Sequence, residues 1–171
     1  AYRVWMLESA GPDACAVFRP GRWVAEVVLP SARVTVQEMA LTEGGVLGGA
    51  GGALRTAVCT RPDLGLTAGE FFPMGLNAEM PGDQARDDAL SVCFDGPVVQ
   101  APLAMLGAAR LRVRLRSDQP RAFIVARLCD VAPNGQSVRI AHGILNLCHR
   151  DSMEYPSHLT PGEAVTAEVV L

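Results

Sequence analysis

The sequence contains no lysine, and all fifteen of its basic residues are arginines. This excludes mechanisms that need a lysine amine, such as Schiff-base chemistry, lysine-containing phosphate loops and kinase-type nucleotide binding. No apolar run reaches the ~18 residues that a membrane span requires. The net charge of −3 leaves no basic surplus for phosphates or anionic lipid. We therefore expect neither nucleic acid nor a membrane as a partner.

The sequence also lacks Gly-x-Ser-x-Gly, the turn that presents the nucleophile of α/β-hydrolases. The run His149-Arg150-Asp151-Ser152 could be a compact triad or a kinase catalytic loop. Neighbouring residues on a strand point to opposite faces, however, and the kinase lysine is missing. A structural turn, with Asp151 and Ser152 bonded to local backbone, is favoured. We predict no catalytic residue in this chain.

Close pairs of metal ligands are missing as well, since neither Cys-x-x-Cys nor a His pair at zinc spacing occurs. We therefore expect no metal and no cofactor. The five cysteines are an odd number and widely spaced, which favours a reducing, cytoplasmic location over a disulfide framework. The sequence does not start with methionine, which suggests a fragment of a longer chain. A zinc site would have to draw on residues at wider spacing: Cys129, His142, Cys148, His149 and His158.

The pattern that is present is an apolar period of two, typical of strands with one buried face. In residues 111–116, LRVRLR, the aliphatic side chains should face a core and the arginines the opposite side. Those arginines could bind an anion or form a solvated or domain-facing surface. Pro133-Asn134-Gly135 predicts a hairpin turn, and residues 82–89 a short helix. The predicted strands are residues 24–29, 33–37, 111–116, 123–129, 138–141, 144–147 and 165–171.

Frequent breakers between short strands, with 17 glycines and 12 prolines, predict an all-β antiparallel sandwich or jelly roll in one domain. Residues 1–43 would hold a connector and the first strands, and residues 83–171 the main body. Residues 44–82 read as a long Gly/Pro-rich surface loop, which in a compact domain is usually functional. This loop contains Phe71-Phe72, an aromatic pair that favours a contact with another surface or a ligand, or a local mini-core.

Several motifs, in the same order and spacing, resemble the C-terminal domain of the CocE/NonD hydrolase family, which is related to X-Pro dipeptidyl-peptidases. The segment PGRWVAE with Leu29-Pro30 resembles the junction with that family's catalytic domain. The other matching motifs are PGDQARDD (81–88), LSVCF (90–94), residues 111–117, ARLCDVAPNG (126–135), GILNLCHRDS (143–152) and LTPGE (159–163).

The resemblance implies a galactose-binding-like jelly roll that follows an α/β-hydrolase domain carrying the Ser, Asp and His of the triad. The family usually continues beyond Leu171 with further strands, so the sandwich could be truncated, with an open edge able to pair with another copy. The parent would hydrolyse an ester or an X-Pro peptide, and this domain would shape the cleft and domain contacts. Its rivals are a carbohydrate-binding module and a purely structural oligomerisation domain. The candidate contact residues are Phe71, Phe72, Trp23 and Tyr155.

Overall fold

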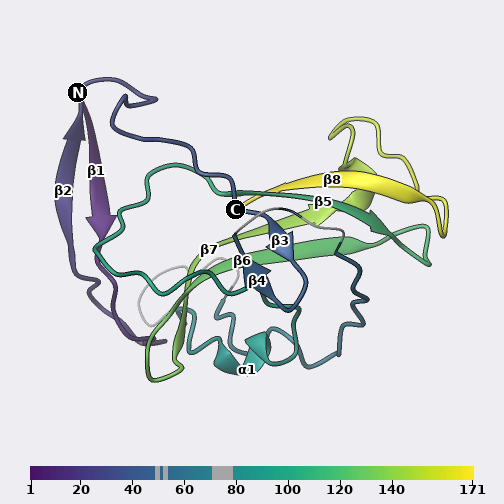
Figure 1. The fold of residues 1–171 in the computed structure, drawn as a ribbon, viewed down its shortest axis with the longest axis horizontal. Coiled ribbons are helices and arrows are strands. Elements are labelled where there is room, and N and C mark those ends of the chain that lie inside the picture. The colour runs from purple at the N-terminus through teal and green to yellow at the C-terminus, as the bar shows by residue number, and fades with distance from the viewer. Residues whose placement is uncertain (49–50, 52–53, 71–78) are drawn as a thin grey trace. The chain divides into compact units, whose positions relative to one another are not determined.

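The computed structural model describes residues 1–48, 51, 54–70 and 79–171 (Figure 1). The chain divides into two compact units. The first unit comprises Ala1–Leu106 with Val131–Val138, and the second comprises Gly107–Asp130 with Arg139–Leu171.

Regular structure in the described residues is almost entirely β-strand. The exceptions are the four-residue helix α1 (Ala85–Asp88) and the 3-10 helix η1 (Leu147–His149). The predicted nearly all-β chain is therefore confirmed over the described residues, and so is the short helix within residues 82–89. Neither of these helices has the length or apolarity needed to cross a membrane.

Two short antiparallel pairs lie in the first unit. Strand β1 (Tyr2–Leu7) pairs with β2 (Gly21–Glu26), which places Trp5 opposite Trp23. Strand β3 (Leu41–Thr42) pairs with β4 (Val46–Leu47). The short strand β4 is also tied to Asp95, because the Leu47 amide donates to the Asp95 carbonyl at 2.8 Å. The start of the long Gly/Pro-rich segment is thus fixed to a distant part of the chain.

The second unit is built from two longer strand pairs (Figure 1). Strand β5 (Arg110–Arg116) pairs antiparallel with β8 (Ala164–Val170), and β6 (Phe123–Val131) pairs with β7 (Ser137–Asn146). Both pairs contribute side chains to one core, as the alternation in the sequence predicts. The core residues are Leu147, Leu159 and Ala167, packed against Leu115, Ala122, Ile124, Leu145 and Val165.

The predicted hairpin turn connects β6 and β7. The Ala132 amide donates to the Gln136 carbonyl at 2.8 Å, and the Gly135 amide donates to the Ala132 carbonyl at 2.9 Å. Gly135 has a φ of 86°, which a residue without a Cβ adopts at low cost. The side chain of Asn134 accepts from the Gln136 amide at 3.1 Å and so holds the turn from within.

Four of the predicted strands need correction. Residues 33–37 form no strand: the Val34 amide donates to the Ser31 carbonyl at 3.0 Å in a turn, and Val36 is 90% exposed. Residues 138–141 and 144–147 were predicted as separate strands, but β7 runs unbroken through Gly143. Strand β2 begins and ends three residues earlier than predicted, and β1 was not predicted.

The two units bury different kinds of side chain. Every buried hydrophobic side chain in the described residues lies in the second unit, and every buried polar or charged one lies in the first. Hydrogen bonds should therefore matter to the stability of the first unit, because leaving a buried polar group unpaired costs free energy. The buried polar residues of the first unit are Glu26, Ser31, Gln84, Asp87 and Ser137.

Candidate functional site

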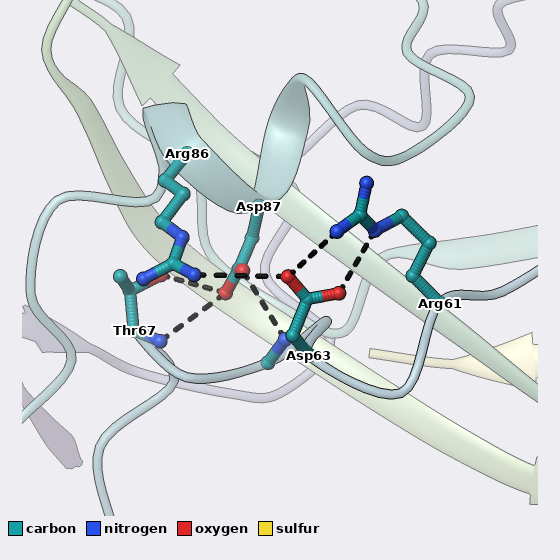
Figure 2. Close-up of polar contacts among 6 residues, drawn as sticks. Arg61, Asp63, Thr67, Arg86 and Asp87 are labelled. Atoms are coloured by element: carbon teal, nitrogen blue, oxygen red, sulfur yellow. Dashed lines mark hydrogen bonds and ion pairs between the residues drawn. The ribbon is translucent and has the colours of Figure 1, made fainter.

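The Asp87 carboxylate anchors the long segment to helix α1. Asp87 is fully buried, and its Oδ1 accepts from the Gly65 amide at 3.1 Å. Its Oδ2 accepts from the Thr67 hydroxyl at 2.6 Å and from the Thr67 amide at 3.3 Å. Figure 2 shows the carboxylate pointing from α1 toward Thr67. Hydrogen bonds to an ionised acceptor are about twice as strong as neutral ones, so this one side chain holds Gly65 and Thr67 of the loop in place.

Gln84, immediately before α1, forms a second set of anchors. Its buried side-chain amide donates to the Thr67 carbonyl at 2.6 Å and to the Gly82 carbonyl at 2.9 Å. The Gln84 backbone amide donates to the Ser137 carbonyl at 2.9 Å, which ties α1 to the tip of the β6–β7 hairpin. Helix α1 therefore connects the loop and the hairpin tip within the first unit.

The two described ends of the loop meet beside this network. The Glu70 amide donates to the Glu79 carbonyl at 3.0 Å, and the Gly82 amide donates to the Thr67 carbonyl at 3.1 Å. At Gly69 a Cβ would lie 2.7 Å from the backbone carbon of Met80, and φ is +71°, so only glycine fits this approach. We call residues 61–70 and 79–82 the stem.

Two arginines, Arg61 in the stem and Arg86 in α1, lie near the Asp63 carboxylate. The Asp63 carboxylate accepts from Arg61 Nε at 2.9 Å and from Arg61 Nη2 at 3.1 Å. Nη2 of Arg86, on α1, lies 3.8 Å from Asp63 Oδ2 (Figure 2). The hydrogen bonds from Arg61 lower the pKa of Asp63, and the charge of Arg86 adds to this effect. These groups are partly exposed, so the ion pairs contribute little stability compared with the buried Asp87 contacts.

Asp83 joins α1 to the hairpin by a separate contact. Its Oδ1 accepts from the Ser137 amide and from the Ala85 amide, both at 3.0 Å. These hydrogen bonds lower the pKa of Asp83, and the bond from the Ser137 amide has the larger effect. The Ser137 hydroxyl itself is buried and has no hydrogen-bond partner in the described structure.

Of the four predicted contact residues, the structure describes Trp23 and Tyr155, one in each unit. Phe71 and Phe72 lie outside the described residues. Trp23 is 68% exposed on β2, where its ring meets that of Trp5 edge to face, with centroids 5.3 Å apart. Tyr155 is 73% exposed in the second unit, and its amide donates to the Ser152 hydroxyl at 3.0 Å. Trp23 and Tyr155 therefore remain candidate contact residues by exposure alone.

Residues 149–152 form a turn with no triad geometry. The ring of His149 contacts the carbonyl oxygen of Ser152 at 3.2 Å, whereas the Ser152 hydroxyl accepts from the backbone amides of Glu154 and Tyr155. Asp151 was predicted to bond local backbone. In the structure its Oδ2 lies 3.2 Å from Arg150 Nε in an ion pair. The hydroxyl is thus occupied in turn formation. Within the described ranges, no three His, Cys, Asp or Glu side chains gather closely enough to hold a metal ion.

An open hollow of about 430 Å³ lies where β2 ends, and the buried carboxylate of Glu26 forms part of its wall. Glu26 accepts from the Ser31 hydroxyl at 2.6 Å and from Arg33 Nε at 3.3 Å, and its other oxygen bonds Arg33 Nη2. Both carboxylate oxygens are therefore already engaged by the protein. The hollow is lined by Ala25, Glu26, Val27, Val28, Ser31, Ala32 and Arg33.

The sequence model of one family, described as the X-Pro dipeptidyl-peptidase C-terminal non-catalytic domain, matches residues 1–171. The chain belongs to this family. A member of the X-Pro dipeptidyl-peptidase C-terminal family is by that description non-catalytic, which agrees with the missing nucleophile turn and with the occupied Ser152.

A curated relative of this family member is the cocaine esterase of Rhodococcus sp. (strain MB1 Bresler), with 30% identity over 106 residues. The match covers 60% of this chain and 17% of the esterase, so the chain spans less than a fifth of that relative. The predicted resemblance to the CocE/NonD and X-Pro dipeptidyl-peptidase C-terminal domains is confirmed.

The role of Asp87 in this X-Pro dipeptidyl-peptidase C-terminal domain was missed by the sequence reasoning. Sequence patterns assign no partner to the carboxylates of Asp83 and Asp87. In the structure Asp83 and Asp87 bind separate sets of backbone donors. The available signal was the motif Pro-Gly-Asp-Gln ahead of a short helix, which indicates a turn but not which distant segment its side chains reach.

The pH dependence of this domain should report the Glu26 contacts. The hydrogen bond from Ser31, followed by that from Arg33, lowers the pKa of Glu26 below its ordinary value of 4.5. The stability that these contacts add is therefore present above pH 4.5 and is lost as the pH falls through the lower folded-state pKa. We expect Ser31→Ala to raise the pKa of Glu26, measured by NMR titration of its carboxyl carbon. An unchanged titration would contradict the assigned cause.

Proposed function

We propose that this chain is the accessory β-domain of a serine α/β-hydrolase, whose catalytic domain would lie in the same polypeptide. Family membership and the similarity to a cocaine esterase support a hydrolase parent that acts on an acyl ester or an X-Pro peptide. The absence of a nucleophile turn supports placing the Ser, His and Asp in the other domain. In this proposal the accessory domain shapes the active-site cleft and forms contacts between domains.

The observation that carries the proposal is the anchored stem. A loop that shapes the active-site cleft of a neighbouring domain must be anchored rigidly to its own domain. Residues that are not held by such support cannot be positioned accurately. Asp87 and Gln84 supply that support through buried hydrogen bonds to Gly65, Thr67 and Gly82. Phe71 and Phe72 follow the stem directly in the sequence and are the residues proposed to contact the substrate or the catalytic domain.

The test is the double variant Phe71→Ala/Phe72→Ala in the full-length parent. We expect kcat/KM for an ester or X-Pro substrate to fall roughly tenfold, because lost positioning in the cleft raises the transition-state energy. Steady-state kinetics on both substrate classes would measure the effect.

The matched control is Phe18→Ala, which removes an aromatic ring that is 74% exposed elsewhere in the first unit. It should leave kcat/KM unchanged. The isolated 171-residue chain should not hydrolyse an activated ester. An unchanged kcat/KM in the double variant for every accepted substrate, or turnover by the isolated chain, would refute the proposal. A saturable calorimetric response to Ca²⁺ and simple sugars would favour the carbohydrate-binding alternative instead.

We also propose that the fold is a galactose-binding-like jelly roll. The nested pairing of the second unit supports it: the outer strands β5 and β8 pair with each other, and the inner strands β6 and β7 pair between them in sequence. Folding a long antiparallel ribbon over itself, as in a jelly roll, produces this order. An experimental structure of the parent should show further strands continuing these pairs. Pairing of a sheet edge with a second copy remains a prediction.

A further inference from the structure

The outer face of the β5–β8 pair carries a row of arginines. Along β5 the arginines alternate with the aliphatic residues Leu111, Val113 and Leu115. The β8 residues opposite these aliphatic residues are partly or fully buried. The arginines lie on the other face, where their partners in the register are Val170, Glu168, Thr166 and Ala164. We call the four residues Arg110, Arg112, Arg114 and Arg116 the arginine strip.

The strip is exposed and its charge is largely unmatched. All four arginines are exposed. Arg110 pairs with Glu168 at 2.6 Å, and in the described part of the chain Arg112, Arg114 and Arg116 have no acidic partner. The chain as a whole carries a net charge of −3, so this patch does not reflect a general excess of basic residues. Three neighbouring unpaired cations repel one another, and an anionic partner would relieve that repulsion.

The spacing of the strip suits an extended acidic segment. Alternate residues on a strand lie ~6.6–6.8 Å apart, so the four guanidinium groups follow a line of roughly 20 Å. Carboxylates at alternate positions of a second extended chain repeat at the same distance. A guanidinium group binds a carboxylate through two parallel hydrogen bonds, which gives each position orientation as well as attraction.

We propose that the arginine strip is a docking surface for an extended acidic segment of a protein, with Asp or Glu at every second residue. The contact between Arg110 and Glu168 already places one carboxylate on this face. A long phosphate polymer is disfavoured because it would extend over the rest of an acidic chain, whereas a short acidic segment contacts only the strip. The partner is therefore defined by its chemistry: alternate carboxylates in an extended backbone.

The test is binding of a fluorescent peptide of alternating Glu and Ser to the 171-residue chain, followed by fluorescence anisotropy. We expect saturable binding at low ionic strength that weakens steeply as salt is added. The triple variant Arg112→Gln/Arg114→Gln/Arg116→Gln should bind roughly tenfold more weakly, since each exposed ion pair contributes about a factor of two. A peptide of the same composition with its Glu residues in one block should bind more weakly than the alternating one.

The matched control is Arg3→Gln/Arg55→Gln/Arg121→Gln, which removes the same charge from exposed arginines that lie outside strand β5. It should bind the alternating peptide about as well as the unchanged chain. Equal losses in the two triple variants would show that only net charge matters and would overturn the proposal. Absence of saturable binding, equal binding of the blocked peptide, or equally tight binding of a thymidine oligonucleotide of the same charge would each overturn it as well.

Discussion

Replacing Asp87 with alanine is expected to destabilise the first unit by about 2–3 kcal/mol, because the substitution removes the charged acceptor of three hydrogen bonds. The Thr67 amide and hydroxyl would lose their partner inside a part-buried network. No buried hydrophobic side chain among the described residues of this unit compensates for that loss. The expected cost is therefore large for a single polar residue.

Urea unfolding of the 171-residue chain, followed by fluorescence of Trp5 and Trp23 in the same unit, would measure the loss. Ser137→Ala is the matched control, because it removes a buried hydroxyl from the same network that has no partner in the described structure. That variant should be as stable as the unchanged chain or slightly more stable. An Asp87→Ala midpoint equal to that of the Ser137→Ala variant would contradict the anchoring role.

Gly143→Ala is expected to cost about 3 kcal/mol or more, since strand β7 meets the end of β8 without room for a side chain. A Cβ at Gly143 would lie 2.1 Å from the Val170 carbonyl oxygen and 2.8 Å from Val169 Cγ1. The first of these atoms belongs to the backbone of a paired strand and cannot rotate away. The strands would have to separate, which would open the core around Leu147.

The comparison for this substitution is Gly96→Ala, where the nearest atom to the added Cβ is Leu47 Cδ2 at 3.9 Å. That substitution should be neutral or slightly stabilising, because alanine restricts the unfolded chain more than glycine does. Thermal unfolding monitored by far-UV circular dichroism would compare the two variants. Equal midpoint temperatures for Gly143→Ala and Gly96→Ala would contradict the close approach of Gly143 in β7 to Val170 in β8.

Local sequence patterns predicted much of the second unit. The alternation in residues 111–116 correctly assigned which side chains of β5 are partly buried and which are exposed. Pro133-Asn134-Gly135 correctly located the turn between β6 and β7. Both features are encoded within a few neighbouring residues, by side-chain alternation and by the low cost of positive φ at glycine.

The same local rules failed where pairing partners decide the outcome. Residues 33–37 have strand-like alternation, but the segment begins in a turn closed by the Ser31 carbonyl, and its Arg33 side chain bonds Glu26. Conversely, Gly143 reads as a strand breaker, although in the structure it allows β7 to pack against Val170. Neither result follows from the segment itself, because each depends on which residues lie across from it.

The sequence by itself determined the β-rich class, the hairpin turn, the lack of a nucleophile turn and the family of this chain, because each is carried by short motifs or by their order along the chain. Only the tertiary structure decided that Asp87 holds the stem, that the apolar core lies in the second unit, and that four arginines of β5 share one exposed face with Glu168. The physical reason is that burial, hydrogen-bond partners and strand register are properties of pairs of distant segments, and a local pattern specifies only one member of each pair.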